Sequence, residues 1–119
     1  MHRVGKGREG EELAARALEN AGFRIIARNF RSSRGEVDLI ALDVGIIAFI
    51  EVKSWSFYGI QDLQYGVDRK KQFRIIETAK YFLSTHRKYN EMAVRFDVIF
   101  VDSGTGAIKY LASAFAEHI

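Results

Sequence analysis

The chain has 119 residues, of which 48% are hydrophobic and 13% aromatic, and it carries a formal net charge of +3. This composition excludes a disordered chain, and the length suits a single domain, 1–119, with one core. Because the chain contains no cysteine, disulfides and thiolate zinc sites are excluded, and no apolar run reaches the roughly 20 residues of a membrane helix. We therefore expect a cytoplasmic protein with no membrane partner, and its mild basicity permits nucleic-acid binding without requiring it.

The N-terminal part predicts a helix. Residues 1–6 are expected to form a loose arm, and a helix is expected from Gly7 to Ala21, where Gly22 is a natural stop. An apolar stripe runs along it through Leu13, Ala14, Ala17, Leu18 and Ala21. Glu11 lies on an edge of this stripe, so its carboxylate can point toward the sheet. An acid in the first turn is also favoured simply by the helix dipole, and both interpretations stay open.

A first strand is predicted from Phe23 to Phe30, followed by a polar connection over 31–34. The next stretch holds two apolar runs separated by Asp43-Val44-Gly45, which is typical of a hairpin. The second run, 46–50, is apolar on both faces, as expected of a central strand covered on both sides. Both runs nevertheless carry charges at the end away from the turn, with Glu36 and Asp38 on the first run, and Glu51 and Lys53 on the second.

Strand geometry predicts that these charges meet. Side chains alternate along a strand, so the two charges of each run share a face. A turn on Val44-Gly45 places Asp38 opposite Glu51, with Cβ atoms about 4.5–5.5 Å apart, whereas a three-residue loop over 43–45 would pair Asp38 with Ile50. Two such carboxylates repel each other unless a cation, either a divalent metal or Lys53, lies between them. The alternative is a buried salt-bridge cluster that only fixes the strand register.

The stretch from Ser54 to Gly66 is the least regular. Its aromatic residues either pack a satellite cluster or stack on splayed bases beside a nucleic-acid site, and they are Trp55, Phe57, Tyr58 and Tyr65.

A second helix is predicted from Val67 to Thr85, with a buried stripe through Ile75, Ile76, Ala79, Phe82 and Leu83. Gln72 lies one turn before this stripe. Its amide either orients a water or a phosphate at a site, or simply reaches water at the end of the helix. Basic residues at this helix start could contact phosphates but not read base edges, and they are Arg69, Lys71 and Arg74.

The C-terminal part predicts a strand from Val94 to Val101 that is apolar on both faces except at Asp97. A turn is expected over 104–106, a short edge strand over 107–110, and a terminal helix or tail over 111–118.

Five sequence blocks, in order, resemble a known family. They are Gly7-Arg8-Glu9-Gly10-Glu11, Arg28-Asn29, Gly35-Glu36-Val37-Asp38-Leu39-Ile40-Ala41, Phe49-Ile50-Glu51-Val52-Lys53 and Arg95-Phe96-Asp97-Val98-Ile99. They look like the bacterial YraN family, which is similar to archaeal Holliday junction resolvases. Asp38 followed by Glu51-Val52-Lys53 also matches the D…(D/E)xK signature of restriction-endonuclease-like (PD-(D/E)xK) nucleases. The resemblance runs from Gly7 to Phe115 and departs at Trp55, where an arginine is usual, which leaves one phosphate contact open.

The resemblance implies an α/β fold with a restriction-endonuclease-like αβββαβ core, a mixed sheet of four or five strands flanked by helices. It implies that Asp38, Glu51 and the Val52 carbonyl bind Mg²⁺ or Mn²⁺. Lys53 would position the attacking water or stabilise the transition state, and Glu11 and Gln72 would be accessory. Because resolvases cut two strands by pairing two active sites, a homodimer would favour that role.

Two functions remain as hypotheses from the sequence. The first is a Mg²⁺-dependent endonuclease-like protein acting on DNA, with branched or structured DNA among its substrates. The second is a non-catalytic nucleic-acid-binding module that retains the nuclease fold. Dependence on a metal separates the two.

Overall fold

The computed structural model describes residues 2–55, 67–102 and 104–117. Phe57, Tyr58 and Tyr65 lie outside the described residues, so the two interpretations of these aromatics stay predictions. The elements in chain order are α1 (His2–Asn20), β1 (Arg24–Ser32), β2 (Gly35–Asp43), β3 (Ile46–Trp55), α2 (Arg69–Thr85), a short 3-10 helix (Arg87–Tyr89), β4 (Ala93–Asp102) and β5 (Ile108–Phe115).

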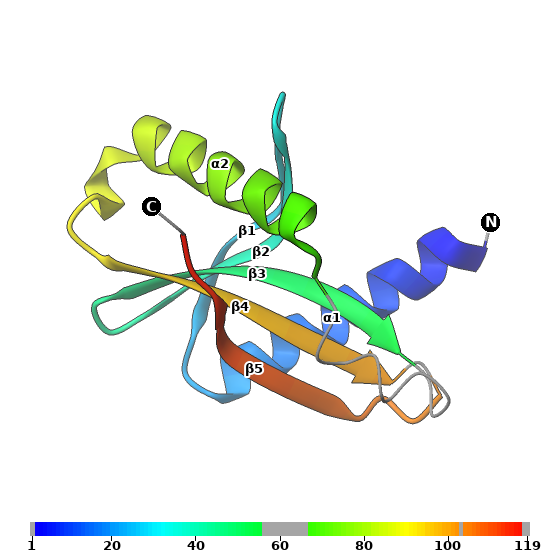
Figure 1. Cartoon of the computed structure of the whole chain (residues 1–119). Coiled ribbons are helices and arrows are strands. Elements are labelled where there is room, and N and C mark those ends of the chain that lie inside the picture. Colours follow the sequence, from blue (N-terminus) through cyan, green and yellow to red (C-terminus); the bar gives the residue numbers. More distant parts are fainter. Residues whose placement is uncertain (1, 56–66, 103, 118–119) are drawn as a thin grey trace.

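The strands form one mixed five-stranded sheet in the order β1-β2-β3-β4-β5. Neighbouring strands are antiparallel except β3 and β4, which are parallel and are joined through the crossover helix α2. Figure 1 shows α1 and α2 on opposite sides of this sheet. The α/β class, the flanking helices and the αβββαβ order are therefore confirmed, with β5 added at the end. Neither helix, over its described residues, is both long and apolar enough to cross a membrane.

Each face of the sheet has its own apolar cluster. On one face, Leu18 of α1 packs with Leu39 and Ile50. On the other, Phe82 of α2 packs with Ile40 and Phe49. The consecutive residues 47–50 of β3 are fully buried, because their side chains alternate between the two clusters. The prediction of a central strand covered on both sides is confirmed.

Two terminal predictions are wrong. Residues 2–6 belong to α1 and do not form an arm, so the glycines at 5 and 7 are accommodated within the helix at a cost of about 1 kcal/mol each relative to alanine. At the other end, β5 continues to Phe115, where a helix or tail was expected over 111–118. The reason is cross-strand pairing, because Phe115 lies opposite Phe96 on β4 and the two rings stack with centroids 5.3 Å apart.

The start of α2 is held close to β2. Asp68 caps the helix, since its Oδ1 accepts a hydrogen bond of 2.8 Å from the Lys71 N–H. Gly35, at φ +152°, opens β2 directly beneath the helix, and a Cβ there would lie 3.1 Å from the Cβ of Arg74. A side chain at position 35 would therefore push α2 away from the strand that carries Asp38.

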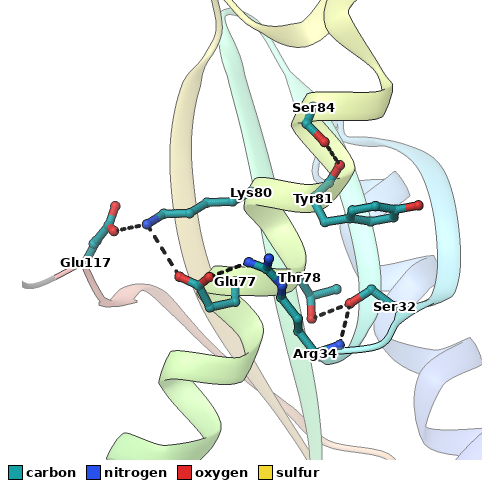
Figure 2. Close-up of polar contacts among 8 residues, drawn as sticks. All are labelled: Ser32, Arg34, Glu77, Thr78, Lys80, Tyr81, Ser84 and Glu117. Atoms are coloured by element: carbon teal, nitrogen blue, oxygen red, sulfur yellow. Dashed lines mark hydrogen bonds and ion pairs between the residues drawn. The ribbon is translucent and has the colours of Figure 1, made fainter.

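Further along, α2 is tied to the β1–β2 connection and to the C-terminal segment by polar contacts (Figure 2). Glu77 accepts a hydrogen bond of 2.7 Å from Arg34 and lies 3.5 Å from Lys80, which also pairs with Glu117. Because acids and bases alternate along this chain of contacts, each charge has an opposite neighbour. These largely exposed pairs each contribute little to stability, but they leave no surplus of either sign beside the helix.

Candidate functional site

The β2–β3 hairpin sets the position of the two predicted acids. Asp43 pairs with Ile46 across a Val44-Gly45 turn, and the register continues to Leu39 opposite Ile50. Gly45 adopts φ +72°, a conformation that favours glycine. The two-residue turn, and not the three-residue alternative, is therefore the one present, and Asp38 and Glu51 are the next residues on the two strands.

Beyond this register, the side chain of Asp38 on β2 bonds to the backbone of β3. The Val52 N–H donates a hydrogen bond of 2.8 Å to Asp38 Oδ2. The recorded backbone pairing between the two strands stops at Leu39 and Ile50, so a carboxylate occupies the place of the next ladder partner. The carboxylate of Asp38 is therefore directed toward β3, where Glu51 lies.

A cavity of about 450 Å³ opens beside this pair of acids. We call it the acidic cavity, and its lining combines residues from α1, β2, β3 and α2. The lining residues are Glu11, Gly35, Glu36, Asp38, Glu51, Val52, Ser54, Lys71, Arg74 and Ile75. Acids outnumber bases among them, so the cavity has a surplus of negative charge at its floor and cations on one wall.

The electrostatics of Asp38 reflect that surplus. Burial, and next the charge of Glu51, raise the pKa of Asp38 to about 8, and the hydrogen bond from Val52 offsets only part of this. Glu11 raises it further through its charge. Glu51 itself is only 4% exposed. Without an added cation, the Asp38 carboxyl therefore holds its proton through most of the neutral range.

Lys71 of α2 supplies a positive charge to Glu51. Its Nζ lies 2.5 Å from Glu51 Oε2. Burial by itself would lower the pKa of Lys71, but the hydrogen bond and charge of Glu51 outweigh it, so the pKa lies above its usual range. This single ammonium leaves the raised pKa of Asp38 in place, so the acid pair is only partly neutralised.

The structure brings together six of the predicted site residues at the acidic cavity, namely Glu11, Asp38, Glu51, Val52, Lys71 and Arg74. It does not bring Gln72 and Arg69 there. The Gln72 amide donates a hydrogen bond of 2.9 Å to the Val67 carbonyl. Gln72 and Arg69 instead line a separate cavity of about 180 Å³. Helical spacing explains the separation, because residues 71, 74 and 75 share one face of α2 whereas 69, 72 and 76 share the next.

Lys53 is half-buried two residues beyond Glu51 on β3 and shares its face by alternation. It is not among the residues that line the acidic cavity. Lys71 instead provides the ammonium that touches Glu51. The sequence placed Lys71 near phosphates but missed this pairing.

Asp38 and Glu51 fit a cation site with few protein ligands better than one enclosed by many. Among the described residues, no three acidic or histidine side chains are arranged as a ready-made metal cage. Mg²⁺ is commonly held by only one or two carboxylates, with waters and substrate phosphates completing its shell. Asp38 and Glu51, with Val52 beside them, fit this sparser type, and the raised pKa of Asp38 marks a place where added positive charge is favourable.

One further residue has no assigned role from the sequence. The Asn29 side-chain amide, on β1, donates a hydrogen bond of 3.0 Å to Glu11 Oε1. Asn29 is also one of two non-glycine residues, among those described, with positive φ. The signals in the sequence were its place in the Arg28-Asn29 block of the family resemblance and its residue type, because asparagine tolerates this backbone conformation better than most residues do.

Comparisons with known proteins agree with the extent of the fold. The model of a family described as "Uncharacterised protein family UPF0102" matches residues 10–101. A UPF0102 protein of Treponema denticola is 44% identical over 104 residues, which cover 82% of this chain and 80% of the relative. A UPF0102 protein of Persephonella marina is 44% identical over 110 residues, 92% of each chain, and one of Clostridium perfringens is 41% identical over 110 residues, 89% of each. The matched residues include the whole lining of the acidic cavity.

Proposed function

The chain belongs to the uncharacterised protein family UPF0102, and on that premise we propose that it is a Mg²⁺-dependent endonuclease-like protein acting on DNA, branched or structured DNA included. The observation that carries the proposal is the convergence of Asp38 and Glu51 on one cavity whose wall bears Lys71 and Arg74. A phosphodiester needs both parts, since cations attract the phosphate and a metal held by carboxylates activates the attacking group.

Five residues of the cavity have a role in this proposal. Asp38 and Glu51 would supply carboxylate oxygens to Mg²⁺ or Mn²⁺, with the Val52 carbonyl as a further ligand. When bound, the cation lowers the pKa of a water and stabilises negative charge on phosphoryl oxygens. Arg74, on the cavity wall, would hold a substrate phosphate.

Lys71 would serve both states of the site. Without a metal, it neutralises Glu51. With a metal bound, its ammonium would be released to the neighbouring phosphate, because Glu51 would then have a stronger cationic partner.

The competing function is a nucleic-acid-binding module that does not cleave. The pairing of Glu51 with Lys71 favours this alternative, because a carboxylate that already has a cationic partner needs no metal. The raised pKa of Asp38 favours the nuclease, because a bound cation would stabilise the ionised form that burial and Glu51 now disfavour. Metal dependence distinguishes the two.

The test is a cleavage assay on duplex, single-stranded and four-way-junction DNA with Mg²⁺ or Mn²⁺. We expect cleavage that a chelator stops, and a loss of at least about 100-fold in Asp38→Asn and Glu51→Gln, because each removes a ligand charge. Asp43→Asn is the matched control, since Asp43 lies in the same hairpin but is exposed at the turn. Cleavage by Asp38→Asn at the wild-type rate would remove the acid pair from the reaction.

Lys53→Ala is the companion variant in this assay. It should lose most cleavage and keep most DNA binding, because its proposed contribution is made in the transition state. If it cleaves normally, the ammonium required by the proposal is that of Lys71.

Three expectations go with the proposal. DNA is the partner, a homodimer would suit cleavage of two strands, and the cytoplasm is the expected location. All three stay predictions, and sedimentation of the protein with and without junction DNA tests the second.

A further inference from the structure

The backbone of Asn29 departs from the strand in which it lies. Its neighbours Arg28 and Phe30 pair in regular register with Leu39 and Val37 of β2, so Asn29 lies opposite Asp38. Yet Asn29 adopts φ +51°, in the left-handed region, which is unfavourable for a residue with a side chain. Such a conformation inside a strand persists only where the surroundings hold it, and it is most often found at functional sites.

The departure is accompanied by a specific contact with α1. The Asn29 Nδ2 donates to Glu11 Oε1 at 3.0 Å, across the edge of the sheet. Glu11 lines the acidic cavity and adds to the charge that raises the pKa of Asp38. The contact therefore joins a strained position on β1 to the acid that α1 contributes.

The chemistry of an amide suits this place. A lysine or arginine at position 29 would hold Glu11 but would also cancel its charge, as Lys71 does for Glu51. An amide donates a hydrogen bond and adds no net charge, so it holds Glu11 by one carboxylate oxygen without placing a cation beside it. The neighbouring residue shows the contrast, since Arg28 donates at 2.8 Å to Glu12, which is not among the residues lining the cavity.

We propose that Asn29 is a positioning residue that holds the Glu11 carboxylate over the acidic cavity as a third acid facing the divalent cation. The inference rests on the proposed function, because it assumes that Asp38 and Glu51 bind that cation. Glu11 would act through the hydration shell of the cation, accepting a hydrogen bond from a bound water with the oxygen that Asn29 leaves free. Asp38 and Glu51 would remain the direct ligands.

The experiment is calorimetric titration of the intact protein with Mn²⁺. Asn29→Gly is the informative variant, because glycine keeps the positive φ without strain and removes only the amide. We expect Mn²⁺ affinity to fall about 10-fold, as for loss of a partner that orients a metal site. Glu11→Ala should fall by a similar factor, and the double variant Asn29→Gly/Glu11→Ala should fall no further, because the two residues act as one unit.

Arg28→Ala is the matched control. It removes the adjacent contact between β1 and α1, so a purely structural role for these contacts would make both variants lower the urea midpoint and neither lower Mn²⁺ affinity. We expect instead that Asn29→Gly lowers Mn²⁺ affinity whereas Arg28→Ala leaves it unchanged.

Wild-type Mn²⁺ affinity in Asn29→Gly, or additive losses in the double variant, would overturn the inference. Asp38→Asn, titrated in parallel, shows whether the proposed function falls with it. If Asp38→Asn has lost Mn²⁺ binding while Asn29→Gly has not, only the role of Asn29 is wrong.

Discussion

Two aspartates of the same sheet, Asp97 on β4 and Asp38 on β2, have opposite surroundings. Asp97 is 0% exposed, and its carboxylate is surrounded by donors. Arg95 reaches it through two nitrogens, at 3.0 and 2.9 Å, the Ser113 N–H donates at 2.9 Å, and the Tyr110 hydroxyl donates as well. Burial and the hydrogen bond to Asp97 raise the pKa of Tyr110, so its hydroxyl stays a donor.

Within the part of the chain that the structure describes, Asp38 has one backbone donor, the Val52 N–H, and its charged neighbours include two acids, Glu51 and Glu11. A carboxylate whose lone pairs are filled by donors and a guanidinium is complete within the fold, as Asp97 is. A carboxylate placed beside other carboxylates is incomplete and gains from an external cation. Burial alone therefore does not mark a functional acid, whereas a raised pKa beside other acids, with few donors to the carboxyl, does.

The largest expected effect is on stability. Asp97→Ala should lower the free energy of unfolding by about 3–5 kcal/mol, because it leaves the partly buried Arg95, the Tyr110 hydroxyl and the Ser113 N–H without their shared acceptor. Asp38→Asn should leave the metal-free protein equally stable or more stable, since it removes a carboxyl that must take up a proton on folding at neutral pH. Urea unfolding at neutral pH measures both. An Asp38→Asn protein that is as unstable as Asp97→Ala would erase the difference between the two sites.

The next largest effect is the dependence of stability on pH that Asp38 should cause. The pKa of Asp38 in the folded protein, about 8, lies above its value of 3.8 in an unfolded chain. The folded state therefore binds the extra proton, and the stability from this group is complete below pH 4 and is lost as pH rises toward 8. We expect wild type to lose a few kcal/mol over this window relative to Asp38→Asn. Parallel pH profiles for the two proteins would contradict the raised pKa.

The pairing of Asp38 and Glu51 was predictable because it depends on local rules. Alternation and a two-residue turn fix which residues face each other, and the apolar run of β3 identifies the centre of the sheet. The family resemblance then supplied the order of elements. The facing of Asp38 and Glu51 depends on the residues of one hairpin and not on how the helices pack against the sheet.

The partners of the acids were not predictable in the same way. Which face of α2 meets the end of β3 depends on how the crossover helix docks, and this decides that Lys71 and not Gln72 reaches the cavity. The left-handed backbone of Asn29 occurs where its side chain contacts Glu11 of α1, a contact that no pattern local to β1 encodes. The extent of β5 likewise depends on pairing with Phe96. All three features are set by tertiary contacts that override the local sequence pattern.

The smallest effect concerns Lys71, which gives the acidic cavity part of the neutralisation that Arg95 gives Asp97. Lys71→Ala should tighten Mn²⁺ binding several-fold, because it removes the cation that competes for Glu51. It should also lower the salt slope of DNA binding by about one, because one phosphate contact is lost. Lys70→Ala is the control for Mn²⁺, since Lys70 is exposed and is not among the cavity residues. Unchanged Mn²⁺ affinity in Lys71→Ala would show that the ammonium does not compete with metal.

The separation of the two acids from Lys71 along the chain has a consequence for the order of folding. Asp38 and Glu51 belong to one hairpin, whereas Lys71 arrives only with the helix that links β3 to its parallel partner β4. Local hairpins close within about 1–10 μs, and parallel pairing across a helical crossover is slower. We therefore expect the hairpin to bring its two carboxyl groups together before their ammonium partner is in place. The docking of α2 then supplies Lys71 to Glu51, so this ion pair should form late in folding.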